Sequence, residues 1–148
     1  MHSDTNNYTI INSLNNVLSN IHYTLSRYNE QLYIRISNNQ LLVVLSLLKN
    51  NSDLRFNVLS DCFAINNNDQ YQSIYYQLLS HELNQRVFIY TKLNSYETQS
   101  IVSIFYNANW YEREIYDMYG IKFLGHPNLK RLFNSEEYQD FPMRRSHK

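Results

Sequence analysis

The chain has 148 residues with 13 basic and 13 acidic side chains, so its formal net charge is zero. This length suits one domain with a substantial core. Balanced charge argues against a nucleic-acid partner, and the longest apolar run, residues 41–48, is too short to span a membrane. The single cysteine, Cys62, excludes an internal disulfide and a multi-cysteine metal site, and we expect its thiol to be buried and inert.

The first fifty residues predict two helices with a hairpin between them. Apolar residues spaced three or four apart predict the helices, the first of them capped by Asp4 or Thr5. Two alternating segments separated by Asn29 and Glu30 predict the hairpin. In chain order, the four elements are expected over residues 6–20, 22–28, 31–37 and 40–50.

The next part of the chain predicts a strand, a turn, a second hairpin, a short strand or linker, and a third helix. In that order, these elements are expected over residues 55–65, 66–69, 71–80 with 85–93, 98–105 and 107–119. Gly120 should end the third helix, because glycine accepts a positive φ at no steric cost. Beyond it we expect an irregular tail with one helical turn at 135–138.

These elements predict an α+β fold. We expect a four- to five-stranded antiparallel or mixed sheet with two helices on one face, a short third helix and an irregular C-terminal tail. Residues 1–123 should form a single domain, and residues 124–148 should extend from it and dock on a partner subunit.

Charged residues are concentrated on the predicted third helix and alternate with large aromatic residues. Arg113 and Asp117 have the i,i+4 spacing of a helical ion pair, and Glu112 and Glu114 flank Arg113. On a solvated face such pairs contribute only about 0.3–0.5 kcal/mol each. Because aromatic residues such as Trp110 lie among the charges, we favour partly buried ions in a structural or interface cluster.

The same region permits a sharper hypothesis, a metal site formed by Glu114, Asp117 and His126. No second histidine lies at helical spacing from either carboxylate, which weakens this hypothesis. General acid–base catalysis by the carboxylates would require a pocket. His126 precedes Pro127 and is more typical of a hydrogen-bonded turn residue than of a ligand.

Glycine and proline are rare in the chain and gather after the third helix, where they are expected to direct the tail. Basic residues follow them, either as a solvated edge or as anchors for an acidic partner surface. The turn-forming residues are Gly120, Gly125, Pro127 and Pro142, and the basic ones are Lys130, Arg131, Arg144 and Arg145.

Two segments carry a resemblance to a known family. "ANWYEREIYDMYGIKFLGHPNLKRLF" (108–133) and "FPMRR" (141–145) resemble the signature of the thirty-kilodalton subunit of respiratory complex I, the mitochondrial subunit-nine and bacterial C-subunit family. Upstream, "LSDCFAIN" (59–66) is similar to a strand of that family. Asn128 departs from the pattern, because the family usually has aspartate there.

The resemblance implies a core structural and assembly subunit with no chemistry of its own. It would support electron transfer from NADH to ubiquinone, coupled to proton pumping, while FMN, the iron–sulfur clusters and ubiquinone belong to neighbouring subunits. The forty-nine-kilodalton subunit of the quinone module is its expected main partner. The residues that we expect to contact other subunits or to shape those contacts are Trp110, Glu112, Arg113, Glu114, Asp117, Gly120, Gly125, His126, Pro127, Arg131, Pro142, Arg144 and Arg145.

The resemblance also implies a place in the cell, peripheral on the matrix side of the mitochondrial inner membrane. The first sixteen residues match neither a secretory signal nor an arginine-rich transit peptide, so a mitochondrial member would be encoded in the organelle. Two alternatives remain open at this point: a stand-alone metal-dependent enzyme using Glu114, Asp117 and His126, and a free binding or assembly module.

Overall fold

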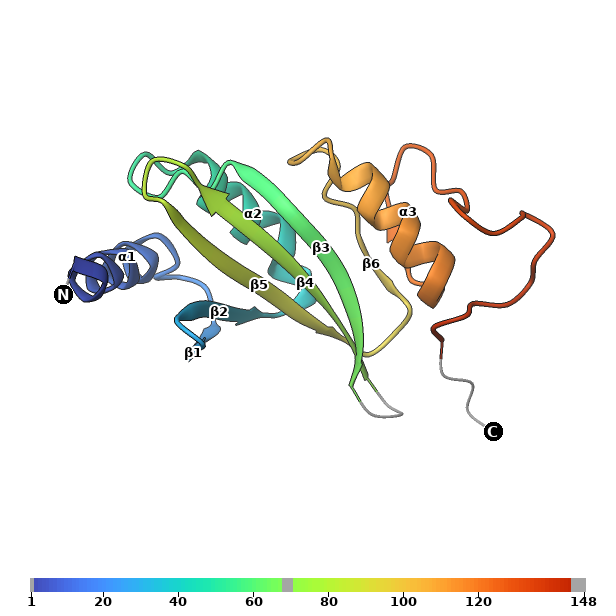
Figure 1. Cartoon of the computed structure of the whole chain (residues 1–148), viewed down its shortest axis with the longest axis horizontal. Helices are drawn as coiled ribbons and strands as arrows, with labels where there is room; N and C mark the ends of the chain where they lie inside the picture. The colour runs from blue at the N-terminus through green and yellow to red at the C-terminus, as the bar shows by residue number, and fades with distance from the viewer. Residues whose placement is uncertain (1, 68–70, 145–148) are drawn as a thin grey trace.

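The computed structural model describes residues 2–67 and 71–144, with side chains from residue 8 onward. A five-stranded sheet carries the helices on one face, with the third helix and the C-terminal tail at its far edge (Figure 1). This confirms the expected α+β fold. In chain order the elements are α1 (His2–Val17), β1 (Tyr23–Tyr28), β2 (Gln31–Ile36), η1 (Asn38–Gln40), α2 (Leu41–Asn50), β3 (Val58–Asn67), β4 (Tyr71–Ser80), β5 (Gln85–Leu93), β6 (Glu97–Gln99), α3 (Ala108–Tyr119) and β7 (Lys122–Leu124).

The main sheet is mixed and has the strand order β1-β2-β5-β4-β3. Both predicted hairpins form antiparallel pairs, and β2 joins them by pairing in parallel with β5. Asn29 and Glu30 form the two-residue loop between β1 and β2, with φ values of 46° and 64°. Positive φ at both positions matches the right-handed twist of the strands, which makes this a type I′ turn.

The core lies between the helices and one face of the sheet. Ile34, Ile89, Tyr76 and Cys62 occupy one register row across four strands, and all are buried. Against them pack leucines from the first two helices and from the turn after α1, namely Leu14, Leu18, Leu41, Leu45 and Leu48. Burying each such side chain contributes roughly 1.5–3 kcal/mol. Cys62 is buried as expected, and burial raises the pKa of its thiol.

Some elements differ from the sequence expectations. α1 already begins at His2, so Asp4 and Thr5 lie inside it rather than capping it. β3 runs from Val58 to Asn67 instead of 55–65, because Arg55 adopts a φ of 43° and the N–H of Phe56 bonds to Leu48. Part of the expected turn at 66–69 therefore belongs to β3, and residues 68–69 lie outside the described residues.

The region after β5 holds an additional small sheet. β6 lies at the start of the expected strand or linker, and it pairs in parallel with β7, a strand that was not predicted from the sequence. α3 connects the region to the main sheet: the hydroxyls of Tyr111 and Tyr119 donate to the carbonyls of Ser60 and Ala64 in β3. No helix among the described residues has the length and apolarity needed to cross a membrane.

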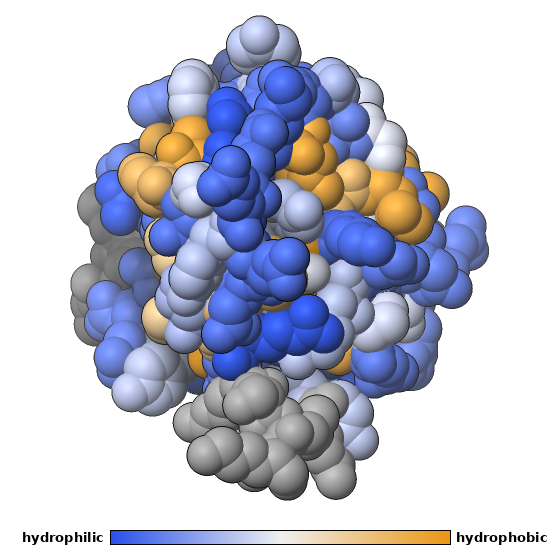
Figure 2. All heavy atoms as spheres, turned by 90° about the vertical axis from the view of Figure 1, so that its right-hand side faces the viewer, coloured by the Kyte–Doolittle hydropathy of each residue, from blue (hydrophilic) through white to orange (hydrophobic). Residues whose placement is uncertain are grey.

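Figure 2 looks onto the face formed by α3 and the tail, from the right-hand side of Figure 1. A ridge of hydrophilic residues runs down this face, and apolar surface shows on either side of the ridge in its upper half. Most of the residues singled out in the sequence belong to this part of the molecule.

Candidate functional site

Helix α3 is the framework of the site. Its inward side carries Ala108, Glu112 and Ile115, all buried against the rest of the domain. The helix ends at Gly120, which has a φ of 74° and whose N–H donates to the carbonyl of Tyr116 at 2.9 Å. Gly120 thus terminates the helix as predicted, in the left-handed conformation that glycine favours.

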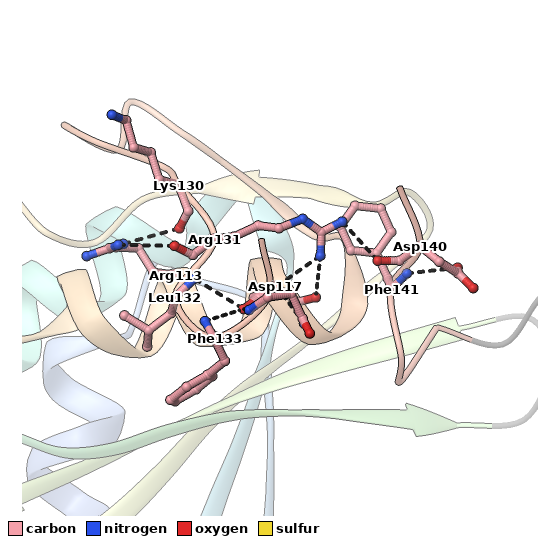
Figure 3. Close-up of polar contacts among 9 residues, drawn as sticks. Arg113, Asp117, Lys130, Arg131, Leu132, Phe133, Asp140 and Phe141 are labelled. Atoms are coloured by element: carbon pink, nitrogen blue, oxygen red, sulfur yellow. Dashed lines mark hydrogen bonds and ion pairs between the residues drawn. The ribbon is translucent and has the colours of Figure 1, made fainter. Parts of the chain in front are cut away.

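Asp117 is fully buried and is enclosed by the tail (Figure 3). Its Oδ2 accepts hydrogen bonds from the backbone N–H groups of Leu132, Phe133 and Asn134, at 3.1, 2.7 and 3.0 Å. Its Oδ1 accepts from Arg131 Nη1 and from Asn134 Nδ2, both at 2.9 Å. Five donors on one short segment therefore converge on a single carboxylate.

This environment keeps Asp117 ionised. Burial by itself raises the pKa of the carboxyl group, but the hydrogen bonds from Asn134, Phe133 and Arg131 outweigh burial and hold the pKa well below its usual range. Hydrogen bonds to a carboxylate stabilise the charged form, and three backbone N–H donors are an unusually complete set. The charge pattern predicted that some ions of this cluster are buried, and Asp117 is one of them.

Arg131 links the helix to the end of the tail. Besides Asp117, its guanidinium reaches the carbonyl of Asp140 through Nη2 at 2.9 Å. The rings of Tyr138 and Phe141 lie 5.5 and 4.7 Å from its central carbon. Because the planar guanidinium combines several donors with cation–π contacts, one side chain joins α3 to residues 138–141 of the tail.

Arg113 has a different role from the expected one. Its guanidinium donates to the carbonyls of Lys130 and Arg131, each at 3.2 Å, and lies 5.3 Å from the ring of Trp110. The predicted helical pair between Arg113 and Asp117 is wrong, because Asp117 pairs with Arg131 instead. The tail presents a guanidinium together with backbone N–H groups, and a helical neighbour alone does not provide that set of donors.

Glu112 forms a second buried site on the same helix. Its carboxylate accepts hydrogen bonds from Ser100 Oγ at 2.6 Å and from the N–H of Ile101 at 2.7 Å. Burial raises the pKa of the Glu112 carboxyl to about 7, although both hydrogen bonds act in the opposite direction. Glu112 thus fastens the loop after β6 to α3, with a carboxyl group that is protonated in part at neutral pH.

His126 lies beside Glu112 and is a turn residue, as expected. Its Nδ1 accepts from the N–H of Asn128 at 3.0 Å, so the neutral ring carries its proton on Nε2, which contacts the carbonyl of Asn109 at 3.3 Å. Burial lowers the pKa of His126. Its 3.9 Å approach to Glu112 is therefore a contact of a neutral imidazole rather than a strong ion pair.

Gly125 and Pro127 flank His126 and shape the start of the tail. The N–H of His126 bonds to Phe123, and Gly125 in this turn has a φ of 83°. A positive φ at the third turn position favours glycine. Pro127 is exposed just beyond the turn.

The end of the tail packs back onto the helix. Phe141 lies so close to Gly120 that a Cβ there would approach its ring to 2.7 Å, and its ring contacts Tyr116 edge to face. Pro142 lies in a turn closed by the N–H of Arg144 and the carbonyl of Phe141. The expected helical turn at 135–138 is only a single hydrogen-bonded turn, from Ser135 to Tyr138.

Two basic residues at the end of the tail complete the predicted set. The guanidinium of Arg144 lies 3.7 Å from the ring centre of Tyr96, beside the small sheet. Arg145 lies outside the described residues. The N–H of Met143 also donates to the carbonyl of Met118 at 2.8 Å, which ties this end directly to α3.

The structure does not assemble the proposed metal ligands. Glu114 is exposed on α3, the oxygens of Asp117 are taken up by the tail, and His126 faces Glu112 and Asn109. Among the described residues, no group of three or more histidine, cysteine, aspartate or glutamate side chains is placed to hold a metal ion.

Sequence reasoning missed three residues of the site. Asn134 donates twice to Asp117, Ser100 binds Glu112, and Phe141 covers Gly120. Asparagine and serine are so common in this chain that neither residue stands out. Next to Phe141, Pro142 indicated a turn in the tail, but it did not indicate that the turn packs Phe141 against Gly120.

Apolar side chains remain exposed around this site. Trp110 on α3 is 61% exposed and Phe133 in the tail is 67% exposed. Tyr106, Leu124, Tyr138 and Met143 add further exposed apolar surface. Large aromatic side chains at a surface are common at protein–protein interfaces, where they provide much of the binding energy.

Comparison with known proteins identifies related chains. Residues 34–148 match the family model described as "Respiratory-chain NADH dehydrogenase, 30 Kd subunit". The chain is 36% identical to the C subunit of the NADH-quinone oxidoreductase of Rickettsia felis over 119 residues, which cover 78% of this chain and 58% of the relative. It is 34% identical over 123 residues to the mitochondrial NADH-ubiquinone oxidoreductase 30.4 kDa subunit of Neurospora crassa. This match covers 81% of this chain and 44% of the relative. The chain thus spans less than two thirds of the length of these two relatives.

Two solved structures share the fold. A trypsin-resistant fragment (1–134) of Nqo5 has a TM-score of 0.62 at 18% identity, with 81% of this chain and 98% of the fragment covered. A chain of an archaeal membrane-bound sulfane sulfur reductase has a TM-score of 0.75 at 16% identity, with 88% of this chain and 78% of that chain covered. At these levels of identity the two structures support the fold alone.

Proposed function

Because the chain belongs to the family of the 30-kDa subunit of respiratory-chain NADH dehydrogenase, we propose that it is a structural subunit of NADH:ubiquinone oxidoreductase. In this proposal it forms part of the quinone module and supports electron transfer from NADH to ubiquinone, coupled to proton pumping. The chain itself contributes packing and assembly, while FMN, the iron–sulfur clusters and ubiquinone are held by neighbouring subunits.

The observation that supports a structural role is the use made of Asp117. In an enzyme, a buried carboxylate on a helix is a candidate base, but here five donors of the chain itself occupy its oxygens. A carboxylate bound in this way has a lowered pKa and little capacity to take up a proton. Its effect is to hold the tail in one conformation on α3.

Docking on the forty-nine-kilodalton subunit would use the surface around that tail. Trp110 and Phe133 are exposed there, and Arg113 lies against Trp110. Glu114 on α3 and Arg144 at the end of the tail supply further charge. Obligate interfaces between subunits are rich in aromatic residues and arginine and often exceed roughly 2,000 Å². A tail preorganised by Asp117 loses less conformational freedom on binding than a mobile one would.

We place this subunit on the matrix side of the mitochondrial inner membrane, as a peripheral subunit encoded in the organelle. The mitochondrial relative from Neurospora crassa supports the compartment.

Assembly tests the proposal directly. In the native host, the wild-type chain should migrate on a native gel with a large NADH-oxidising assembly, and Arg113→Ala or Asp117→Ala should prevent its incorporation. Glu136→Ala, which removes an exposed carboxylate from the same tail, is the matched control and should assemble normally. The proposal fails if the wild-type chain migrates as a small free protein, or if Asp117→Ala yields an assembled and active complex.

A further inference from the structure

The outer face of the main sheet is the largest feature that the site above leaves unused. The helices cover one face, and among the described residues no helix crosses the other, which is turned toward the viewer in Figure 1. We propose that this outer face binds a segment of a neighbouring subunit in which apolar side chains lie beside two or more carboxylates. This inference rests on the proposed function.

Aromatic side chains form the middle of the outer face. Phe63, Tyr75 and Tyr90 occupy one register row across β3, β4 and β5, and their neighbouring rings stack at 5.3 and 4.9 Å. Tyr33 and Phe88 form a second stack at 4.7 Å in the next row. All five are only partly buried, and four of them, Tyr33, Phe63, Tyr75 and Tyr90, line a shallow, mainly apolar hollow of about 310 Å³.

The charged side chains around these rings are mostly positive. The outward positions of the main strands carry Arg35, Arg86 and Lys92, against a single carboxylate, Asp61. Arg35 lies directly beside Tyr90 in the parallel register, so the cations continue the aromatic row. Arg35, Lys92 and His22 also line a polar hollow of about 850 Å³, and none of the described residues that line it is acidic. The chain as a whole is neutral, so this positive excess is local.

The ring geometry favours a protein segment over single-stranded nucleic acid. Bases bind such sheets by stacking on free aromatic faces. Here the rings stack on one another within 4° to 11° of parallel and offer mainly their edges. Ring edges carry the positive end of the aromatic quadrupole, which suits carboxylates and aliphatic groups. A second copy of the chain would bring like charges face to face.

Carbodiimide cross-linking of the intact complex tests the acidic partner. This reagent joins an amine to a carboxylate only when the two are in contact. We expect an amide between Lys92 and an aspartate or glutamate of another subunit, identified by mass spectrometry, and its loss in Lys92→Arg, which keeps the charge without the amine. An assembled complex with no adduct at Lys92 would overturn the inference and leave the proposed function standing.

Charge reversal provides the second arm. Arg35→Glu combined with Lys92→Glu should reduce incorporation into the complex about tenfold, because like charges then face each other. The matched control is Arg27→Glu, an exposed position on β1 that points to the opposite face, and it should incorporate within about twofold of wild type. Equal incorporation of the double variant and the control overturns the inference. So does an adduct at Lys92 to a second copy of this chain, or a nuclease-sensitive adduct formed at the outer face under ultraviolet light.

Discussion

Asp117 on α3 and Arg131 in the tail form a buried ion pair across fourteen positions of sequence, with 2.9 Å between Oδ1 and Nη1. The pair does not stand alone, because Arg131 also binds Asp140 and the three backbone N–H groups that follow it bind Asp117. The helix end and some ten residues of tail therefore form one cooperative unit.

Replacing Arg131 with lysine should weaken this unit although the charge is kept. The ammonium group reaches Asp117 or Asp140 but not both, and it loses the planar contact with Phe141. We expect a loss of about 1–2 kcal/mol in the free energy of unfolding, measured with urea. Lys130→Ala, at the exposed neighbouring position, should change it by less than about 0.5 kcal/mol. Equal effects of the two substitutions would contradict the network.

Asp117→Asn should destabilise the chain most at neutral pH. Since the folded-state pKa of Asp117 is depressed, its ionised form stabilises the fold above the ordinary pKa of about 3.9, and this contribution is lost as pH falls toward the folded-state value. We expect the free energy of unfolding to be lower than that of the wild type by about 3 kcal/mol at pH 7, and this deficit should shrink below pH 4. Urea unfolding at each pH measures it. A deficit that stays constant from pH 7 to pH 2.5 would show that charge is not responsible.

Gly120→Ala should cost more than Gly125→Ala, although both residues have positive φ. Backbone strain of about 1–2 kcal/mol applies at both positions. Only at Gly120 would the added Cβ also displace Phe141, while Gly125 has open space around it. The difference between their free energies of unfolding measures the contact with Phe141. In limited proteolysis, trypsin should cut after Arg131 faster in Gly120→Ala than in Gly125→Ala, and equal rates would contradict the predicted contact.

Glu112→Gln should remove a pH-dependent loss of stability. The folded-state pKa is raised to about 7, so the contribution of Glu112 is fully present below its ordinary pKa and is lost as pH rises through 7. The glutamine amide keeps a partner for both Ser100 and Ile101. We expect wild type and variant to be similar near pH 4, and the variant to be more stable by up to about 3 kcal/mol above pH 7.5. Parallel stability curves would contradict the raised pKa.

Most of the local structure could be predicted from the chain alone. The alternation around Asn29 and Glu30 predicted the first hairpin, and Gly120 ends α3 because a residue without Cβ is favoured there. These features follow from short-range rules of periodicity and allowed φ. The local charge pattern was less informative, because Arg113 and Asp117 have ideal helical spacing and still choose different partners.

Tertiary structure decided which groups meet. The parallel pairing of β2 with β5, the β6–β7 pair and the five donors around Asp117 all join residues distant in sequence. A carboxylate accepts hydrogen bonds from any donor that the fold delivers, so spacing along one helix does not determine its partner. Likewise, the alternating pattern showed which strand residues share a face. Only the placement of α1 and α2 on one face, with α3 at the far edge, left the aromatic face of the sheet uncovered.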